Sequence, residues 1–162
     1  MMNKAIFLDR DGVINDPGEH YYVHRVEDFS INEGVIEALG AWQERDYLLI
    51  LISNQGGIAR GLFSREDTDR VHRYLEEVLA AEGIYLSAIY YCPHHDSVER
   101  CLCRKPEPLL LQKAMARFGI EPEDAWFIGD SDKDMEAGKR AGIHTRKIGR
   151  NENLRTLLRE IR

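Results

Sequence analysis

Short apolar runs alternate along the chain with longer stretches in which apolar residues recur every three or four positions. The short runs are rich in β-branched and aromatic residues and lie at 5–8, 47–52, 88–91 and 125–128, with a further candidate near 144–148. Runs that are apolar at consecutive positions are typical of strands buried on both faces of a parallel sheet. The pattern therefore predicts four or five parallel strands.

The stretches between these runs have the apolar spacing of amphipathic helices. Their apolar faces are formed by Val35, Ile36, Leu39 and Trp42, by Val71, Tyr74, Leu75, Val78 and Leu79, by Leu110, Leu111, Ala114 and Phe118, and by Leu154, Leu157, Leu158 and Ile161. Ser64 is placed to cap the second of these helices, and Gly83 and Gly119 are placed to end the second and third. The segment 133–141, before Gly142, has a weaker pattern of the same kind.

Strands and helices in alternation predict an α/β fold, a doubly wound, Rossmann-like parallel sheet flanked by helices. The length of 162 residues favours a single domain over 1–162. Hydrophobic residues make up 43% of the chain, and none of their runs approaches the roughly 18 residues of a membrane span. The formal net charge of −6 argues against nucleic acid as the main partner. We expect a monomer that binds neither nucleic acid nor membrane, and a cytoplasmic one, because the run 5–8 is too short for a signal peptide.

Polar side chains follow four of the predicted strands at the point where each strand ends. Asp9 follows the first strand, Ser53 and Asn54 the second, Cys92 the third and Asp130 the fourth. In open α/β sheets, ligands bind in the crevice outside the carboxyl ends of the strands. Four separate segments of the sequence are therefore expected to bring reactive side chains to one place.

The acidic residues of this group indicate a site for a divalent cation. Asp9 and Asp11 leave the first strand two positions apart, and Gly12 allows a sharp turn after them. The segment 129–134 supplies more carboxylates after the fourth strand. Clustered carboxylates repel unless a hard cation neutralises them, and oxygen ligands suit Mg²⁺. Alone, Asp-x-Asp-Gly is more often a solvated turn or a calcium-type loop, so the signal lies in the combination of segments.

The same residues fit phosphoryl transfer. One carboxylate can attack phosphorus and form a phospho-aspartyl intermediate while a second carboxyl group passes protons, and Asp9 and Asp11 fit these two roles. The candidates for stabilising the transferred group are Ser53, Asn54, the amides of Gly56 and Gly57, and the cation of Lys105. Taken alone, Lys105 would be interpreted as a surface residue, because lysines are mostly exposed.

These segments resemble the four motifs of the haloacid-dehalogenase-like superfamily of phosphohydrolases. The motifs are Asp9-x-Asp11-Gly12, Ser53 after a strand, Lys105 before a proline, and Gly129-Asp130 followed by Asp134. The resemblance implies that Asp9 is the nucleophile, Asp11 the general acid/base, and Ser53 and Lys105 the stabilisers of the phosphoryl group. It also implies that Asp9, Asp130 and the main-chain carbonyl of Asp11 hold Mg²⁺. Only 44 positions separate Asp9 from Ser53, so we expect an enzyme without the mobile cap domain that many members carry.

Three cysteines and a histidine within one short segment indicate a second metal. Cys92, His94, Cys101 and Cys103 form a Cys₃His set that can close a tetrahedral Zn²⁺ site, and His95 could replace His94. The alternative is a group of free, buried cysteines. A site with four protein ligands has no open position, so the zinc is expected to be structural and to staple the loop that carries Lys105.

The cysteine loop also resembles one branch of the superfamily, the zinc-loop phosphatases that act on heptose bisphosphate or on histidinol phosphate. The segments 22–24, 54–61 and 89–95 look like the heptose enzymes. This resemblance implies Mg²⁺-dependent hydrolysis of the 7-phosphate of a heptose 1,7-bisphosphate, a small phosphorylated sugar, with histidinol phosphate as the alternative substrate. The implied substrate contacts are Arg10, Glu19, His20, Tyr21, Tyr22, Asn54, Gln55, Gly56 and Arg104, with Arg60 as a candidate for the second phosphate. A departure is Ser131, which stands where the branch commonly has a lysine, although Lys133 is close by.

The other features favour ordinary structural roles. His24, His72 and His144 are expected at the surface or paired with a partner, because an aspartate mechanism does not require them. Arg60 could equally be an exposed loop residue. A zinc-binding module without chemistry is the third hypothesis, but such a module for nucleic acid should be basic, whereas this loop contains Asp96 and Glu99.

Overall fold

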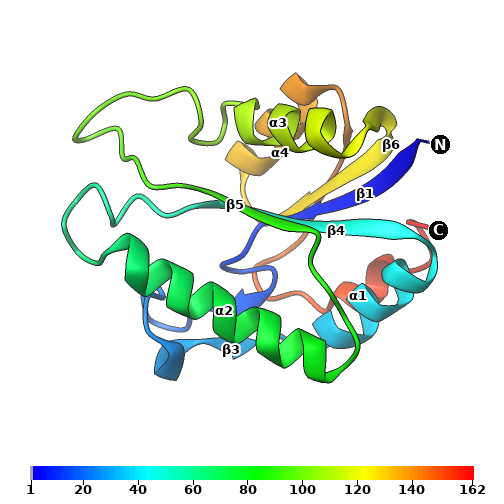
Figure 1. Ribbon diagram of the computed structural model, residues 1–162, viewed down its shortest axis with the longest axis horizontal. Coiled ribbons are helices and arrows are strands. Elements are labelled where there is room, and N and C mark those ends of the chain that lie inside the picture. The colour runs from blue at the N-terminus through cyan, green and yellow to red at the C-terminus, as the bar shows by residue number, and fades with distance from the viewer. Residues whose placement is uncertain (1) are drawn as a thin grey trace.

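Five parallel strands form the central sheet in the computed structural model, which describes residues 2–162 (Figure 1). The strands are β1 (Asn3–Leu8), β4 (Tyr47–Asn54), β5 (Ala88–Cys92), β6 (Ile120–Gly129) and β7 (His144–Lys147), and their spatial order is β5-β4-β1-β6-β7. The chain builds β4 and β5 on one side of β1 and then β6 and β7 on the other. The sheet is therefore doubly wound, as predicted, with its topological switch point beside β1.

Four helices cover the two faces of this sheet (Figure 1). α1 (Val35–Glu44) and α2 (Arg65–Ala81) pack on one face, whereas α3 (Leu109–Phe118) and α4 (Asp132–Ala141) pack on the other. Ser64 and Ser131 begin α2 and α4, each exchanging hydrogen bonds with the residue three positions later. These four helices confirm the helical periodicity of the sequence, including the weak pattern before Gly142.

The central strand β1 shows why the strand segments are apolar at consecutive positions. Ile6 and Leu8 point into the core beneath α1 and α2, while Ala5 and Phe7 point into the core beneath α3 and α4. All four side chains are fully buried. Because alternate residues of a strand face opposite sides of the sheet, a strand covered on both faces has no polar positions.

Two parts of the chain differ from the sequence-based expectation. The segment expected as a last helix, 154–161, forms only a short 3₁₀ helix, η2 (Leu154–Leu157). The amides of this segment donate three positions back, as Thr156 does to Asn153 and Leu158 does to Arg155, which is the 3₁₀ pattern. Its last carbonyls, at Leu158 and Ile161, accept from Arg45, and Trp42 Nε1 also donates to Ile161, so the segment is anchored to α1. In addition, β6 begins five residues earlier than the apolar run, at Ile120.

The segment between β1 and β4 stays close to the sheet. It contains β2 (Asn15–Asp16) and β3 (Ser30–Ile31), which pair as an antiparallel ribbon, the single turn η1 (Val26–Asp28), and α1. Within residues 2–162 this insertion holds no further helix or strand that could form a cap over the sheet. No helix in the same range has the length and apolar character needed to cross a membrane.

Candidate active site

A polar cavity of about 190 Å³ opens at the carboxyl ends of β1, β4 and β6. Its lining consists of Asp9, Asp11, Asn54, Lys105, Asp130, Ser131, Lys133 and Asp134. These residues come from four separate segments of the sequence. Three of them follow β1, β4 and β6 as expected, whereas Cys92 after β5 does not line the cavity and the fourth segment is that of Lys105. The cavity therefore lies where open α/β sheets bind their ligands, beside the switch point.

Lys105 places a buried positive charge between two carboxylates of this cavity. Its Nζ lies 2.8 Å from Asp9 Oδ1 and 2.7 Å from Asp134 Oδ1, and it donates a hydrogen bond of 3.1 Å to the carbonyl of Ile52. The residue is only 3% exposed. Burial would lower the pKa of Lys105, but the two carboxylates outweigh it and raise that pKa. Lys105 is therefore a permanent buried cation beside the candidate nucleophile.

One carboxylate oxygen of Asp9 is fixed by hydrogen bonds, and the other is available to react. Oδ1 accepts hydrogen bonds from Lys105 Nζ and from the main-chain amide of Arg10, at 2.8 and 2.9 Å. Burial raises the pKa of Asp9, Asp134 and Asp11 add to this shift, and Lys105 only partly opposes it. A second positive charge near Asp9 would therefore favour the ionised form that a nucleophile needs.

The carboxylates fit a divalent cation. Asp9, Asp130 and Asp134 each offer an oxygen, and the three oxygens lie within 4.8 Å of one another. Asp134 is already paired with Lys105 and accepts hydrogen bonds from the main chain and hydroxyl of Ser131, so Asp9 and Asp130 are the open ligands. Burial also raises the pKa of Asp130. Oxygen donors on repelling, half-desolvated carboxylates are a suitable set for Mg²⁺.

Gly12 lets the Asp9 loop approach Asp130 closely. A side chain at this position would collide with Asp130 Oδ2, and the backbone has a φ of 85°, which favours glycine. The first and fourth motifs can therefore meet only because position 12 has no Cβ.

Asp11 is held by three side chains. Its Oδ1 accepts from Arg10 Nη2 and from Asn15 Nδ2, both at 3.0 Å, and its Oδ2 accepts from Gln55 Nε2 at 3.2 Å. The side chain keeps 26% of its surface exposed, toward the cavity that it lines. Sequence reasoning missed Asn15 as a partner of Asp11, although its position four residues later in the same turn was a usable signal.

The residues after β4 divide into two roles. Ser53 is buried next to the cavity, and its Oγ accepts a 2.9 Å hydrogen bond from Gln55 Nε2. Asn54 instead holds the main chain of Lys105: its Oδ1 accepts from the amide at 3.0 Å, and its Nδ2 donates to the carbonyl at 3.2 Å. Asn54 and Gln55 were expected to contact substrate. In this structure the amide of Asn54 holds the main chain of Lys105 and Gln55 Nε2 holds Ser53 and Asp11, while Gln55 Oε1 has no hydrogen-bond partner among residues 2–162.

The cysteine loop gathers all four candidate zinc ligands. The ligand atoms of Cys92, His94, Cys101 and Cys103 lie within 4.8 Å of one another. The sulfur of Cys92 is 3.6 Å from that of Cys101 and 3.2 Å from that of Cys103, and His94 Nδ1 is 3.2 Å from the Cys103 sulfur. Ligands of a tetrahedral zinc lie roughly 3.5–3.8 Å apart, given Zn–S and Zn–N bonds of about 2.3 and 2.0 Å, so this cluster fits the metal.

The structure distinguishes the two histidines of this loop. His94 turns its Nδ1 toward the sulfur atoms, whereas the ring of His95 is directed to Ser97, with a separation of 2.7 Å between Nδ1 and Oγ. His95 therefore lies outside the cluster. Burial raises the pKa of the Cys92 thiol, so without a metal this sulfur keeps its proton.

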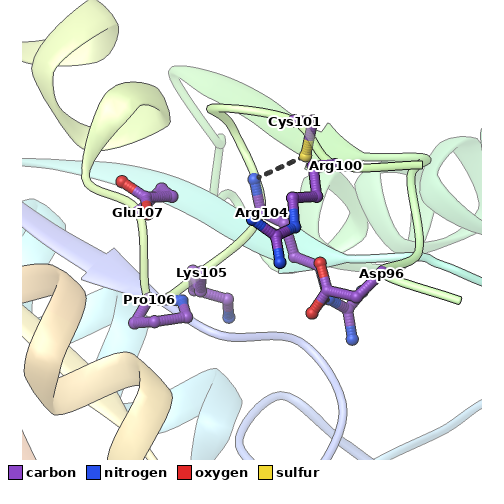
Figure 2. Close-up of a pocket in the computed structure, with 7 residues that line it drawn as sticks. All are labelled: Asp96, Arg100, Cys101, Arg104, Lys105, Pro106 and Glu107. Carbon is purple, nitrogen blue, oxygen red and sulfur yellow. Dashed lines mark hydrogen bonds and ion pairs between the residues drawn. The ribbon is translucent and has the colours of Figure 1, made fainter.

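A second cavity, of about 420 Å³, shares Lys105 with the first and lies against the cysteine loop (Figure 2). It is lined by Asp96, Arg100, Cys101, Arg104, Lys105, Pro106 and Glu107. The main-chain amide of Arg104 donates to the sulfur of Cys101 at 3.3 Å, which ties the loop directly to the residue before Lys105 (Figure 2). A metal in the cluster would therefore fix the backbone that carries Lys105.

Four of the remaining expected contacts belong to the loop 19–22, which lines neither cavity. Glu19, His20 and Tyr21 are exposed, and Tyr22 packs edge-on against Phe63. Arg10 was predicted to contact the substrate, but its side chain is fully buried behind Asp11, which leaves only its main chain available for such a contact. The charge of its guanidinium is paired with Asp11.

The fold and this site define a phosphohydrolase of the haloacid-dehalogenase-like class. A family model described as HAD-hydrolase-like matches residues 102–160. A crystal structure of a D,D-heptose 1,7-bisphosphate phosphatase from B. bronchiseptica, complexed with magnesium and phosphate, superimposes with a TM-score of 0.84 at 31% identity, covering 97% of this chain and 86% of that one. The chain is thus a phosphoric monoester hydrolase.

Curated relatives narrow this class. A D-glycero-beta-D-manno-heptose-1,7-bisphosphate 7-phosphatase from Pasteurella multocida is 44% identical over 147 residues, covering 88% of this chain and 79% of that protein. A D-glycero-alpha-D-manno-heptose-1,7-bisphosphate 7-phosphatase from Campylobacter jejuni is 41% identical over 145 residues, covering 90% and 81%. The chain belongs to this family of heptose-1,7-bisphosphate 7-phosphatases.

Proposed function

We propose that this chain removes the 7-phosphate of a D-glycero-D-manno-heptose 1,7-bisphosphate by way of a phosphate ester on Asp9. The observation that carries the proposal is the contact between Asp9 and the buried cation Lys105 at the switch point of the sheet. A carboxylate with one oxygen fixed and a neighbouring permanent positive charge is suited to attack an anionic phosphoryl group. Relatives of both anomeric names match this chain, so the proposal includes both anomers.

The residues of the site supply each part of a two-step displacement. In the first step, Asp9 Oδ2 attacks phosphorus, the bond from phosphorus to the sugar oxygen breaks, and Asp11 gives that oxygen a proton. In the second step, Asp11 takes a proton from water, which attacks phosphorus and releases inorganic phosphate from Asp9. Lys105 and the Ser53 hydroxyl stabilise the negative charge of the transferred group in both steps.

Two metals support this chemistry. Asp9 and Asp130, with the main-chain carbonyl of Asp11, would hold Mg²⁺, which when bound supplies positive charge to the phosphoryl oxygens and orients them. Zn²⁺ in the cluster of Cys92, His94 and the two later cysteines would be structural, because all four of its positions are filled by protein. Its contribution is to hold Lys105 in place through the adjacent Arg104.

The second phosphate of the substrate has candidate partners at the rim. Arg104 Nε is buried and has no hydrogen-bond partner among residues 2–162, its nearest acid being Asp96 at 3.9 Å. Several cations lie near His95. Desolvation lowers the pKa of His95, and the positive charges of Arg104, Arg60 and Lys133 lower it further. Arg104 lines the cavity beside Lys105, and a guanidinium in that place is suited to bind a phosphate. A monophosphate such as histidinol phosphate would leave this group unused.

A phosphate-release screen tests the proposal. We expect Mg²⁺-dependent release from both anomers of heptose 1,7-bisphosphate to exceed release from histidinol phosphate. Arg104→Ala should lower kcat/KM for the bisphosphate more than for a small generic phosphate ester, because only the bisphosphate uses the distal contact. Faster hydrolysis of histidinol phosphate would replace the heptose proposal with that alternative, and equal losses for both substrates would indicate a broad-specificity phosphatase.

The same proposal includes the form in which the chain acts. We expect it to work as a monomeric, single-domain enzyme in the cytoplasm, where a reducing environment keeps the three cysteines available as zinc ligands. Mass measurement of the native protein at working concentration tests the monomer, and elemental analysis of the same sample tests for one zinc per chain.

A further inference from the structure

A buried polar cluster that the two-step chemistry does not use lies directly behind Asp11. It consists of Arg10, whose side chain has no exposed surface, and His72 of α2, which is 5% exposed. Buried charged and imidazole groups are costly unless they are paired, so each member of such a cluster needs a partner. The contacts of Arg10 show which partners these are.

The guanidinium of Arg10 is shared among three acceptors. Nε and Nη2 donate to Asp11 Oδ1 at 3.2 and 3.0 Å, and Nη2 also lies 3.1 Å from Asp11 Oδ2. Nη2 donates to the main-chain carbonyl of Val23 at 2.6 Å, and Nη1 donates to His72 Nε2 at 3.2 Å. Because the guanidinium is planar and has fixed donor directions, holding two of its corners sets the direction of the third.

His72 must act as an acceptor in this arrangement. Arginine has no acceptor and does not lose its proton in proteins, so the nitrogen that faces it has to be the unprotonated Nε2 of a neutral ring. Burial, followed by the charge of Arg10, lowers the pKa of His72 to about 3, which agrees with this geometry. The ring also packs edge-on against Tyr91 of β5, with 5.5 Å between centroids, which fixes its orientation.

We infer that Arg10 and His72 are positioning residues for Asp11: His72 and the Val23 carbonyl aim the Arg10 guanidinium, and the guanidinium fixes the carboxylate that passes the protons. This inference rests on the proposed function, because it assigns the role of the cluster through Asp11. The Arg10 side chain contacts Asp11 from the side away from the cavity, and His72 acts on Asp11 only through Arg10. Lys105 and Asp9 form a separate pair across the cavity, so losing the cluster should affect proton transfer more than attack by Asp9.

Three variants separate this role from a general effect on folding. His72→Phe keeps the ring volume but removes the acceptor, His72→Gln restores an acceptor at similar reach, and Thr68→Val changes a buried polar residue on the same helix outside the cluster. For hydrolysis of heptose 1,7-bisphosphate, we expect His72→Phe to lower kcat about tenfold to a hundredfold with KM little changed, since small misplacement of a catalytic group costs this much. His72→Gln should stay within about threefold of the unmodified chain, and Thr68→Val should match it.

The fraction of Asp9 that carries phosphate during turnover identifies the step that is affected. With ³²P-labelled 4-nitrophenyl phosphate, the leaving group departs without a proton, so attack by Asp9 needs no help from Asp11, whereas hydrolysis of the aspartyl phosphate does. Acid-quenched His72→Phe should therefore carry at least as much phosphate as the unmodified chain while its kcat is lower. A phosphorylated fraction that falls together with kcat, an unchanged kcat, or failure of His72→Gln to restore activity would each overturn the inference. An unmodified chain that turns over but never carries phosphate on Asp9 would overturn the proposed function itself.

Discussion

Asn54 holds the main chain of Lys105 by both ends of its amide, and removing this clamp should misplace the buried cation. Asn54→Ala deletes hydrogen bonds of 3.0 and 3.2 Å to the amide and carbonyl of Lys105. At about 0.5–1.5 kcal/mol for each bond, the free energy of unfolding should fall by about 1–3 kcal/mol. A shift of the Lys105 Nζ by about 1 Å should lower kcat by up to about a hundredfold.

Gln43 provides a matched control, because it forms the same kind of clamp far from the site. Its Nε2 donates to the carbonyl of Gly83, and its Oε1 accepts from the amide of Tyr85, both at 2.8 Å. Gln43→Ala and Asn54→Ala should show similar losses in urea unfolding, but only Asn54→Ala should lose kcat in a phosphate-release assay. Full activity in Asn54→Ala, or equal loss in both variants, would refute the reasoning.

Three other changes test the nucleophile, the cluster and the buried histidine. Asp9→Asn should abolish turnover and leave the fold intact, because the amide cannot attack phosphorus; circular dichroism and labelled-phosphate trapping check both points. Cys101→Ser should lower bound zinc and kcat together, and added Mg²⁺ should not restore activity. The pKa of His72 is about 3 in the folded chain against 6.5 unfolded, so the unfolded state binds the extra proton and stability falls as pH drops through this window. Between pH 7 and pH 5 this loss is about 2 kcal/mol, and urea unfolding should show it reduced in His72→Gln.

The order of strands and helices could be predicted from the sequence because each element has its own local signal. β1 is apolar at consecutive positions since both of its faces are covered, and Ser64 and Ser131 begin helices with side-chain caps. The C-terminal segment had an equally clear apolar spacing but forms only η2. There the amides donate three positions back, and the last carbonyls are bonded by Arg45 and Trp42, which lie more than 100 positions earlier; periodicity carries no information about such contacts.

The site residues were predictable as far as they follow strands or stand in metal-ligand spacing. Asp9 and Asp130 lie together in one cluster, and the four cysteine-loop ligands lie together in another. Which way a polar side chain points was not predictable: Arg10 turns inward to Asp11, and Asn54 turns to the backbone of Lys105. His72 was expected at the surface or paired with an unspecified partner. Nothing in its position on α2 indicates that this partner is Arg10, which follows β1.

The balance of charge in the site explains why these side chains turn as they do. Lys105 compensates Asp9 and Asp134 from one side, and Arg10 compensates Asp11 from the other, each at hydrogen-bond distance. Asp130 is paired with neither of these two cations, so its carboxylate and the free oxygen of Asp9 are the negative groups that a bound Mg²⁺ would neutralise. If Arg10 faced the substrate, Asp11 would have no paired cation. It would then add another unpaired negative charge to the carboxylates that surround the magnesium site. The inward turn of Arg10 therefore compensates Asp11 from behind and leaves Asp9 and Asp130 as the carboxylates that a divalent ion would neutralise.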